Sequence, residues 1–289
     1  MIDEAIKAKL RDPAYLDLHL QAVTAIRQVG KVEWYDSHFV RRFEVAKLYL
    51  SQVRPDALEA FEHGFDALLP PPGFANIVID DLFDDAIREQ IRDAARSIPS
   101  EWLKDYEMRD FGRHIVHDYP LFVDLQQKLL PRISALIGRE LVTGYNFLSL
   151  YGGSGRCDPH MDEPESMFTL DYCVEQSHEW PIWFSKVVDW PTLDDIRTYD
   201  AKAIKADPAL AFRPYVLREG EALLFNGSSQ WHYRDAIPPG GSCSLLFFHY
   251  YPAGCYELVW PQLWAEHFDI PELAPLCELF HESGRDGLG

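Results

Sequence analysis

Apolar residues recur at three- to four-residue spacing through the first part of the chain, which is the spacing of one face of a helix. Segments 15–29 and 38–53 both carry this pattern, and Pro55-Asp56 opens a further short amphipathic segment. The run Leu69-Pro70-Pro71-Pro72-Gly73 follows, and prolines at this density end any helix. We therefore predict an N-terminal helical region over residues 1–69.

The pattern is mixed from residue 74 to residue 140 and changes to β after it. A short apolar run at 74–79 predicts a strand, and amphipathic spacing predicts helices at 86–98 and 125–138. Short apolar or alternating runs, separated by Gly, Pro, Asp and Ser, then predict seven strands: 141–151, 167–175, 180–188, 212–219, 221–226, 232–237 and 242–252. So many short strands favour a sandwich or a barrel. After Pro252 the chain returns to a helical tail over 253–289.

Charge and composition exclude some classes of function. The 289 residues carry a formal charge of −19, which disfavours binding to nucleic acid or to anionic membranes. No signal peptide and no apolar stretch of membrane-spanning length is present, so we expect a soluble, cytoplasmic protein. An odd number of cysteines without a CxxC pair favours reduced thiols: Cys157, Cys173, Cys243, Cys255 and Cys277.

Three residues suggest a metal site. His160 and Asp162 are two apart at the end of an apparent strand, so both side chains point to the same face. His232 lies in an equally strand-like setting further along the chain. Two imidazoles and one carboxylate form the facial triad that holds Fe(II) while leaving coordination positions open.

The surrounding motifs resemble the prolyl-4-hydroxylase-like branch of the Fe(II)/2-oxoglutarate-dependent oxygenases. The motifs are YGGSGRCDPHMD, with Tyr151 ahead of His160, then REGEALLFNGSSQWH and GGSCSLLFFHYYP, in the family's order over residues 74–252. The resemblance implies an α+β fold with a double-stranded β-helix, a jelly-roll or cupin-like barrel. It also implies Fe(II), 2-oxoglutarate and O₂, with hydroxylation of an unactivated carbon in a small molecule or an amino-acid side chain. Tyr151 and Ser244 match family contacts to 2-oxoglutarate.

One family residue is missing. The family usually carries Arg or Lys about ten residues after the distal histidine, where it grips the far carboxylate of 2-oxoglutarate. Here that position is Ser242. Lys186 is the preferred replacement, because a subset of the superfamily uses a lysine on the fourth barrel strand. Arg234 and Arg156 are the other candidates, and a different co-substrate stays open.

Several alternatives accompany this reading. A cupin-like metalloenzyme that does not use 2-oxoglutarate would also explain the missing cation, and a non-enzymatic jelly-roll binding module would make the triad incidental. His178 and His249 are expected to be ordinary core or surface residues. For the polar cluster Arg113, His114 and His117 a solvated loop is favoured over a substrate entrance. The substrate is a small molecule or a peptide, and the N-terminal helices form either a homodimer interface or a cover for the pocket.

Overall fold

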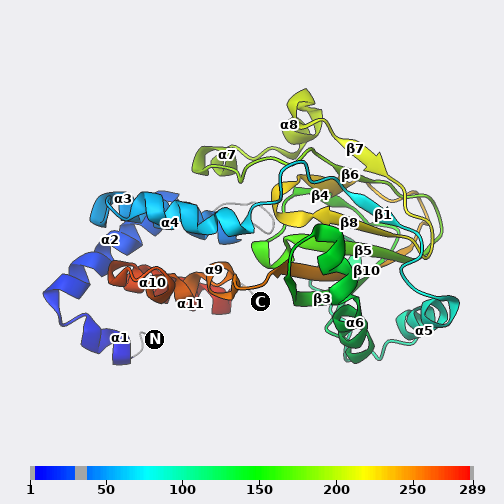
Figure 1. Cartoon of the computed structure of the whole chain (residues 1–289), viewed down its shortest axis with the longest axis horizontal. Coiled ribbons are helices and arrows are strands. Elements are labelled where there is room, and N and C mark those ends of the chain that lie inside the picture. The colour runs from blue at the N-terminus through cyan, green and yellow to red at the C-terminus, as the bar shows by residue number, and fades with distance from the viewer. Residues whose placement is uncertain (1–3, 30–37, 287–289) are drawn as a thin grey trace. The chain divides into compact units, whose positions relative to one another are not determined.

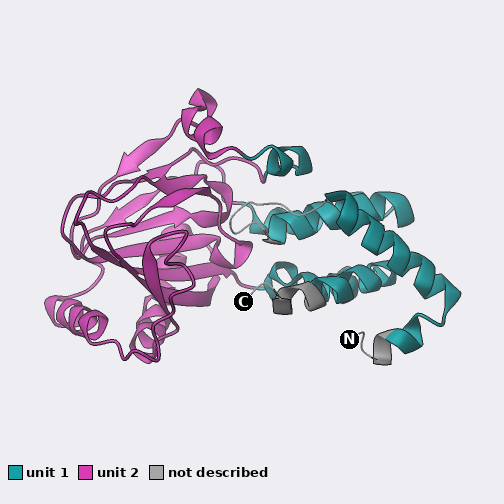
Figure 2. Ribbon diagram, turned by 180° about the vertical axis from the view of Figure 1, so that it is seen from behind, with its two compact units in different colours: residues 1–69, 191–199, 254–289 teal, residues 70–190, 200–253 magenta. Residues whose placement is uncertain are grey.

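The computed structural model describes residues 4–29 and 38–286, which form two compact units. Unit 1 comprises residues 1–69, 191–199 and 254–289, and unit 2 comprises residues 70–190 and 200–253 (Figure 2). Unit 1 is therefore assembled from three separate stretches of chain, with the predicted helical region and the predicted tail in the same unit.

Unit 1 is helical among its described residues (Figure 1). Both N-terminal helices expected from the apolar spacing are present. The elements are α1 (Glu4–Lys9), α2 (Pro13–Val29), α3 (His38–Val53), α4 (Leu58–Gly64), η1 (Phe65–Leu68), α7 (Leu193–Arg197), α9 (Tyr256–Val259), η5 (Pro261–Leu263), α10 (Trp264–His267), η6 (Pro271–Leu273) and α11 (Ala274–Asp286).

Aromatic packing joins the two ends of the chain within unit 1. The rings of Phe61, Phe65 and Trp264 lie with their centroids 5.1 to 5.5 Å apart, in tilted or edge-on pairs. The Tyr49 hydroxyl donates to the backbone oxygen of Glu272 at 2.8 Å. Large buried aromatics dominate the energy of such cores, so the tail stabilises the N-terminal helices and they stabilise it.

Unit 2 contains two antiparallel sheets and the remaining helices. The six-stranded sheet has the order β1-β8-β5-β10-β3-β2, and the four-stranded sheet has the order β4-β9-β6-β7. The strands are β1 (Ile77–Ile79), β2 (Arg113–His117), β3 (Leu141–Tyr151), β4 (Cys157–His160), β5 (Phe168–Gln176), β6 (Ile182–Phe184), β7 (Arg213–Tyr215), β8 (Ala222–Asn226), β9 (His232–Arg234) and β10 (Cys243–Pro252). The helices are α5 (Asp85–Arg96), α6 (Pro120–Ile137), η2 (Pro164–Ser166), α8 (Ala201–Ala206), η3 (Pro208–Leu210) and η4 (Gly227–Ser229).

The predicted solvated loop around Arg113 is wrong. Residues 113–117 form β2, which pairs with β3 so that Arg113 lies opposite Tyr151. The segment RHIVH tolerates burial because Ile115 and Val116 are apolar and because Glu107 forms an ion pair with the Arg113 guanidinium. A charged residue at the start of a strand concealed the strand pattern in the sequence.

Side-chain alternation separates the two faces of the large sheet. Tyr250 on β10 donates its hydroxyl to the backbone oxygen of Gln126 on α6, so its face is the one that α6 covers. Ser244 shares that parity, whereas Phe247 and His249 point to the opposite face, toward the small sheet. The sheets meet there through the ion pair of Arg234 with Asp171 at 2.8 Å. The space between the sheets is thus where inner-face side chains from both sheets gather.

No disulfide links the five cysteines, all of which lie in the described part of the chain. Among the helices described, none has the length and apolar character needed to cross a membrane.

Candidate metal centre

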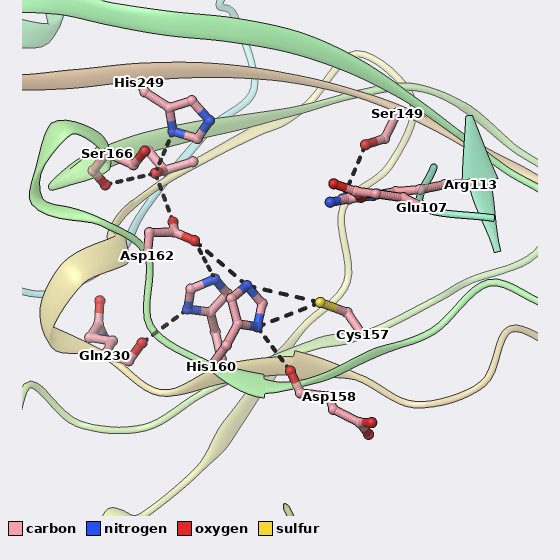
Figure 3. Close-up of polar contacts among 12 residues, drawn as sticks. Glu107, Arg113, Ser149, Cys157, Asp158, His160, Asp162, Ser166, Gln230 and His249 are labelled. Atoms are coloured by element: carbon pink, nitrogen blue, oxygen red, sulfur yellow. Dashed lines mark hydrogen bonds and ion pairs between the residues drawn. The ribbon is translucent and has the colours of Figure 1, made fainter. Parts of the chain in front are cut away.

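The structure brings the three predicted ligands together between the sheets. His160 ends β4 and lies opposite His232, the first residue of β9, in the register of that strand pair. Their ring centroids are 4.1 Å apart. Oδ1 of Asp162 lies 3.6 Å from Nε2 of His160 and 3.5 Å from Nε2 of His232 (Figure 3). One ligand atom from each of the three side chains falls within 4.8 Å of the others.

Backbone carbonyls fix the tautomers of both histidines. Nδ1 of His160 lies 2.9 Å from the backbone oxygen of Asp158, and Nδ1 of His232 lies 3.0 Å from that of Gln230. Because a carbonyl oxygen only accepts, each Nδ1 carries a proton, and in the neutral form of each ring Nε2 is the nitrogen with the lone pair. Both lone pairs are directed at Asp162. This is the usual support for a metal-binding imidazole, whose second nitrogen donates to an oxygen.

Protonation also favours a cation at this point. Burial, with the adjacent His232, lowers the pKa of His160 to about 3. Burial acts to raise the pKa of Asp162, but His232 and His160 hold it below its ordinary value. At neutral pH His160 therefore presents a lone pair to the ionised carboxylate of Asp162. That arrangement is repulsive unless a cation lies between them, so the donor set fits a divalent ion such as Fe(II).

The Asp162 carboxylate is oriented from behind. The backbone N–H of Asp162 donates to the backbone oxygen of Gly227 at 2.9 Å. Any Cβ at position 227 would meet Asp162 Oδ2 at 2.3 Å, so the carboxylate occupies the space that a side chain would take. The hydroxyl of Thr169 lies 3.3 Å from the same Oδ2. These contacts leave Oδ1 as the oxygen that faces the imidazoles.

His249 lies inside the protein beside this site. It is buried and hydrogen-bonded, as expected for a core residue, with Nδ1 3.0 Å from the Thr169 hydroxyl. Its Nε2 is buried and has no hydrogen-bond partner among the described residues. The rings of Tyr145 and Phe147 contact it at centroid distances of 4.3 and 5.4 Å. His249 lies within the motif GGSCSLLFFHYYP, but no spacing in the sequence revealed its contact with Thr169, which is eighty positions away.

The residues expected to contact 2-oxoglutarate lie in different environments. Tyr151 is buried on β3 and accepts a hydrogen bond from Nη1 of Arg113 at 2.8 Å. Arg234 is buried on β9 and pairs with Asp171. Ser244 points to the face of the large sheet that α6 covers, as Tyr250 does, and away from the small sheet.

The expected position of Lys186 on a barrel strand is not observed. Strand β6 ends at Phe184, and Lys186 lies two residues beyond it with an exposed side chain. The N–H of Ser185 still bonds to Trp231 in line with the β6–β9 register, whereas the N–H of Lys186 bonds to Leu210 instead. Arg156, the remaining candidate, is also exposed.

Comparisons with known proteins return structures only. No protein-family model and no curated protein matches the chain. The crystal structure of HygX from Streptomyces hygroscopicus with nickel, 2-oxoglutarate and hygromycin B bound is 14% identical, has a TM-score of 0.49, and aligns over 68% of this chain and 87% of its own. The non-heme alpha ketoglutarate dependent epimerase SnoN from nogalamycin biosynthesis is 15% identical, has a TM-score of 0.47, and aligns over 72% of this chain and 90% of its own.

A viral collagen prolyl hydroxylase from Paramecium Bursaria Chlorella virus-1 is 10% identical, with a TM-score of 0.40 and coverage of 62% of this chain and 96% of its own. With identities of 15% or less and TM-scores below 0.5, these structures resemble the chain only in the path of the backbone. The function has to be argued from the side chains.

Proposed function

We propose that this chain is a non-haem Fe(II) oxygenase that uses 2-oxoglutarate and O₂ to hydroxylate an unactivated carbon of a small molecule or an amino-acid side chain. One observation carries the proposal. Two imidazoles, each with Nδ1 donating to a backbone carbonyl, place their Nε2 atoms beside Oδ1 of a buried carboxylate. Ligands on one side of a metal leave the other side open for a bidentate oxoacid and O₂.

The metal and its co-substrate supply the oxidising chemistry when they are bound. The residues of this chain hold and orient them. His160, Asp162 and His232 bind the ion, the carbonyl of Asp158 and that of Gln230 orient the two imidazoles, and burial keeps His160 unprotonated.

We also propose that the two sheets of unit 2 form a double-stranded β-helix. The large and small antiparallel sheets, joined across their inner faces by Arg234 and Asp171, support that architecture. Of the expected cofactor contacts, Tyr151 stays the strongest because it is an inner-face residue on β3. The N-terminal helices as a homodimer interface stay a prediction. Analytical ultracentrifugation would test it by measuring the mass of the protein in solution.

The test measures binding before it measures turnover. We expect anaerobic titration with Fe(II), or with Co(II) as a stable substitute, to give one site per chain, followed by binding of 2-oxoglutarate. His160→Ala should abolish both, while His178→Ala, at an exposed histidine, should leave both unchanged. Aerobic consumption of 2-oxoglutarate should follow the same pattern. Metal binding without any oxoacid binding would favour the cupin-like alternative, and absence of metal binding would favour the binding module.

A further inference from the structure

Arg113 is a buried cation that the metal site does not use. It is 6% exposed on β2, and Nη1 donates to the Ser149 hydroxyl at 3.2 Å and to the Tyr151 hydroxyl at 2.8 Å. Its Nε donates to Glu107. A buried guanidinium is costly unless it is compensated, so a site that retains one invites a functional explanation.

The two hydroxyls have protons left to donate. A hydroxyl oxygen that accepts from a guanidinium still carries its own hydrogen. In the described part of the chain, neither the Ser149 nor the Tyr151 proton has an acceptor. Burial raises the pKa of Tyr151, against the effect of Arg113, so this phenol keeps its proton. Arg113, Ser149 and Tyr151 thus form a group of donors, which we call the β2–β3 cradle, suited to a carboxylate.

The β2–β3 cradle lies on the same face of the large sheet as the residues beside the metal site. Ser149 on β3 is opposite Leu245 on β10, which has the parity of His249. The charge of Arg113 contributes to the lowered pKa values of both His160 and His249, after burial as the main cause. In Figure 3 the Arg113 side chain and Ser149 stand across from Asp162 and His249, on the side to which the second ring nitrogen of His249 points.

We propose that the β2–β3 cradle binds the far carboxylate of the oxoacid co-substrate, in place of the basic residue that is missing at Ser242. This rests on the proposed function. Arg113 supplies the charge, and the hydroxyls of Ser149 and Tyr151 supply two further hydrogen bonds to the same carboxylate.

The other cations fit this role less well. Arg234 bonds to Asp171, whose side chain is fully buried, so diverting it to a ligand would leave an uncompensated charge between the sheets. Lys186 is exposed. The partner of Arg113 is different, since Glu107 belongs to the turn segment before β2 and its side chain is 16% exposed. Glu107 bonds to Nε, whereas Nη1 bonds to the two hydroxyls of the cradle.

The experiment compares two oxoacids that differ only in the far carboxylate. Calorimetry on Co(II)-loaded protein under anaerobic conditions gives the Kd of 2-oxoglutarate and that of 2-oxobutanoate. We expect Arg113→Gln to weaken 2-oxoglutarate on the order of 100-fold and Tyr151→Phe about 10-fold, because each removes a bond to a charged group. Binding of Co(II) and of 2-oxobutanoate should be unchanged, which also shows that the variants are folded.

Arg156→Gln and Lys186→Gln, at exposed positions, are the matched controls and should bind 2-oxoglutarate like the wild type. Equal 2-oxoglutarate affinity in Arg113→Gln and the wild type would overturn the cradle and leave the proposed function intact. Selective loss of 2-oxoglutarate in Lys186→Gln would also overturn it. A wild-type protein that binds Co(II) but neither oxoacid would overturn the proposed function and the cradle with it.

Discussion

The hydroxyl of Thr169 lies 3.3 Å from Oδ2 of Asp162, while Oδ1 is the oxygen nearest the imidazoles. Thr169 therefore supports the carboxylate without reaching the metal position. We expect Thr169→Val to weaken Co(II) binding about 10- to 100-fold, as loss of a bond to a ligand usually does. Thr169→Ser restores the hydroxyl and should bind nearly as the wild type does. An unchanged Kd in the valine variant would show that this bond does not orient the ligand.

Position 227 should accept only glycine. A Cβ there would meet Asp162 Oδ2 at 2.3 Å and the backbone oxygen of Ser166 at 2.6 Å. Gly227→Ala should displace the carboxylate and lower both metal affinity and the free energy of unfolding. Gly153→Ala is the control, because its Cβ would have nothing nearer than 4.0 Å. Metal titration and urea unfolding of both variants give the comparison, and similar behaviour of the two would refute the steric argument.

The ion pair of Arg234 and Asp171 should matter for stability through its burial. Arg234→Met leaves the Asp171 carboxylate unpaired between the sheets, and we expect a loss of about 3 to 5 kcal/mol in the free energy of unfolding. The double variant Arg234→Met with Asp171→Leu removes both charges and should recover most of that loss. Urea unfolding of the single and double variants measures the difference. A double variant no more stable than the single one would show that the unpaired Asp171 carboxylate does not cause the loss of stability.

Acid should destabilise the metal-free protein through its buried histidines. Burial lowers the pKa of His249 from 6.5 to about 4. Between these values the unfolded chain binds a proton that the folded chain does not, so stability is complete above about pH 6.5 and falls toward pH 4. The full effect of one such group is about 3 kcal/mol.

His249→Phe, which suits the aromatic surroundings, should give a shallower pH dependence of the unfolding free energy, measured with a chelator present. His160 adds a further slope of the same sign, since its pKa is lowered to about 3. His178→Ala should leave the dependence unchanged. A slope in His249→Phe as steep as in the wild type would contradict burial of a neutral imidazole at this position.

The metal ligands could be predicted because their geometry is largely local. His160 and Asp162 are two apart in the sequence, and the pairing of β4 with β9 then brings His232 opposite His160. The helices of residues 13–29 and 38–53 were predictable for the same reason, since their apolar spacing is regular.

The supporting residues were missed because their contacts are long-range. Arg113 reaches Ser149 and Tyr151 only after β2 pairs with β3, and no spacing in the sequence encodes that register. Lys186 was misplaced for a related reason. An apolar run predicted a strand through Val188, but the strand ends at Phe184, and the N–H of Lys186 bonds to Leu210.

The discontinuity of unit 1 has a consequence for how the chain matures during synthesis. Unit 2 is complete in sequence once residue 253 has been made, so both sheets and all three metal ligands are then available. Helices α2 and α3 pack against each other but gain the rest of their core only when residues 254–286 appear, because α11 packs against α2 and Trp264 packs edge-on against Phe39 of α3. Removal of the chain from residue 254 onward would therefore retain the three proposed metal ligands while exposing an apolar helical surface.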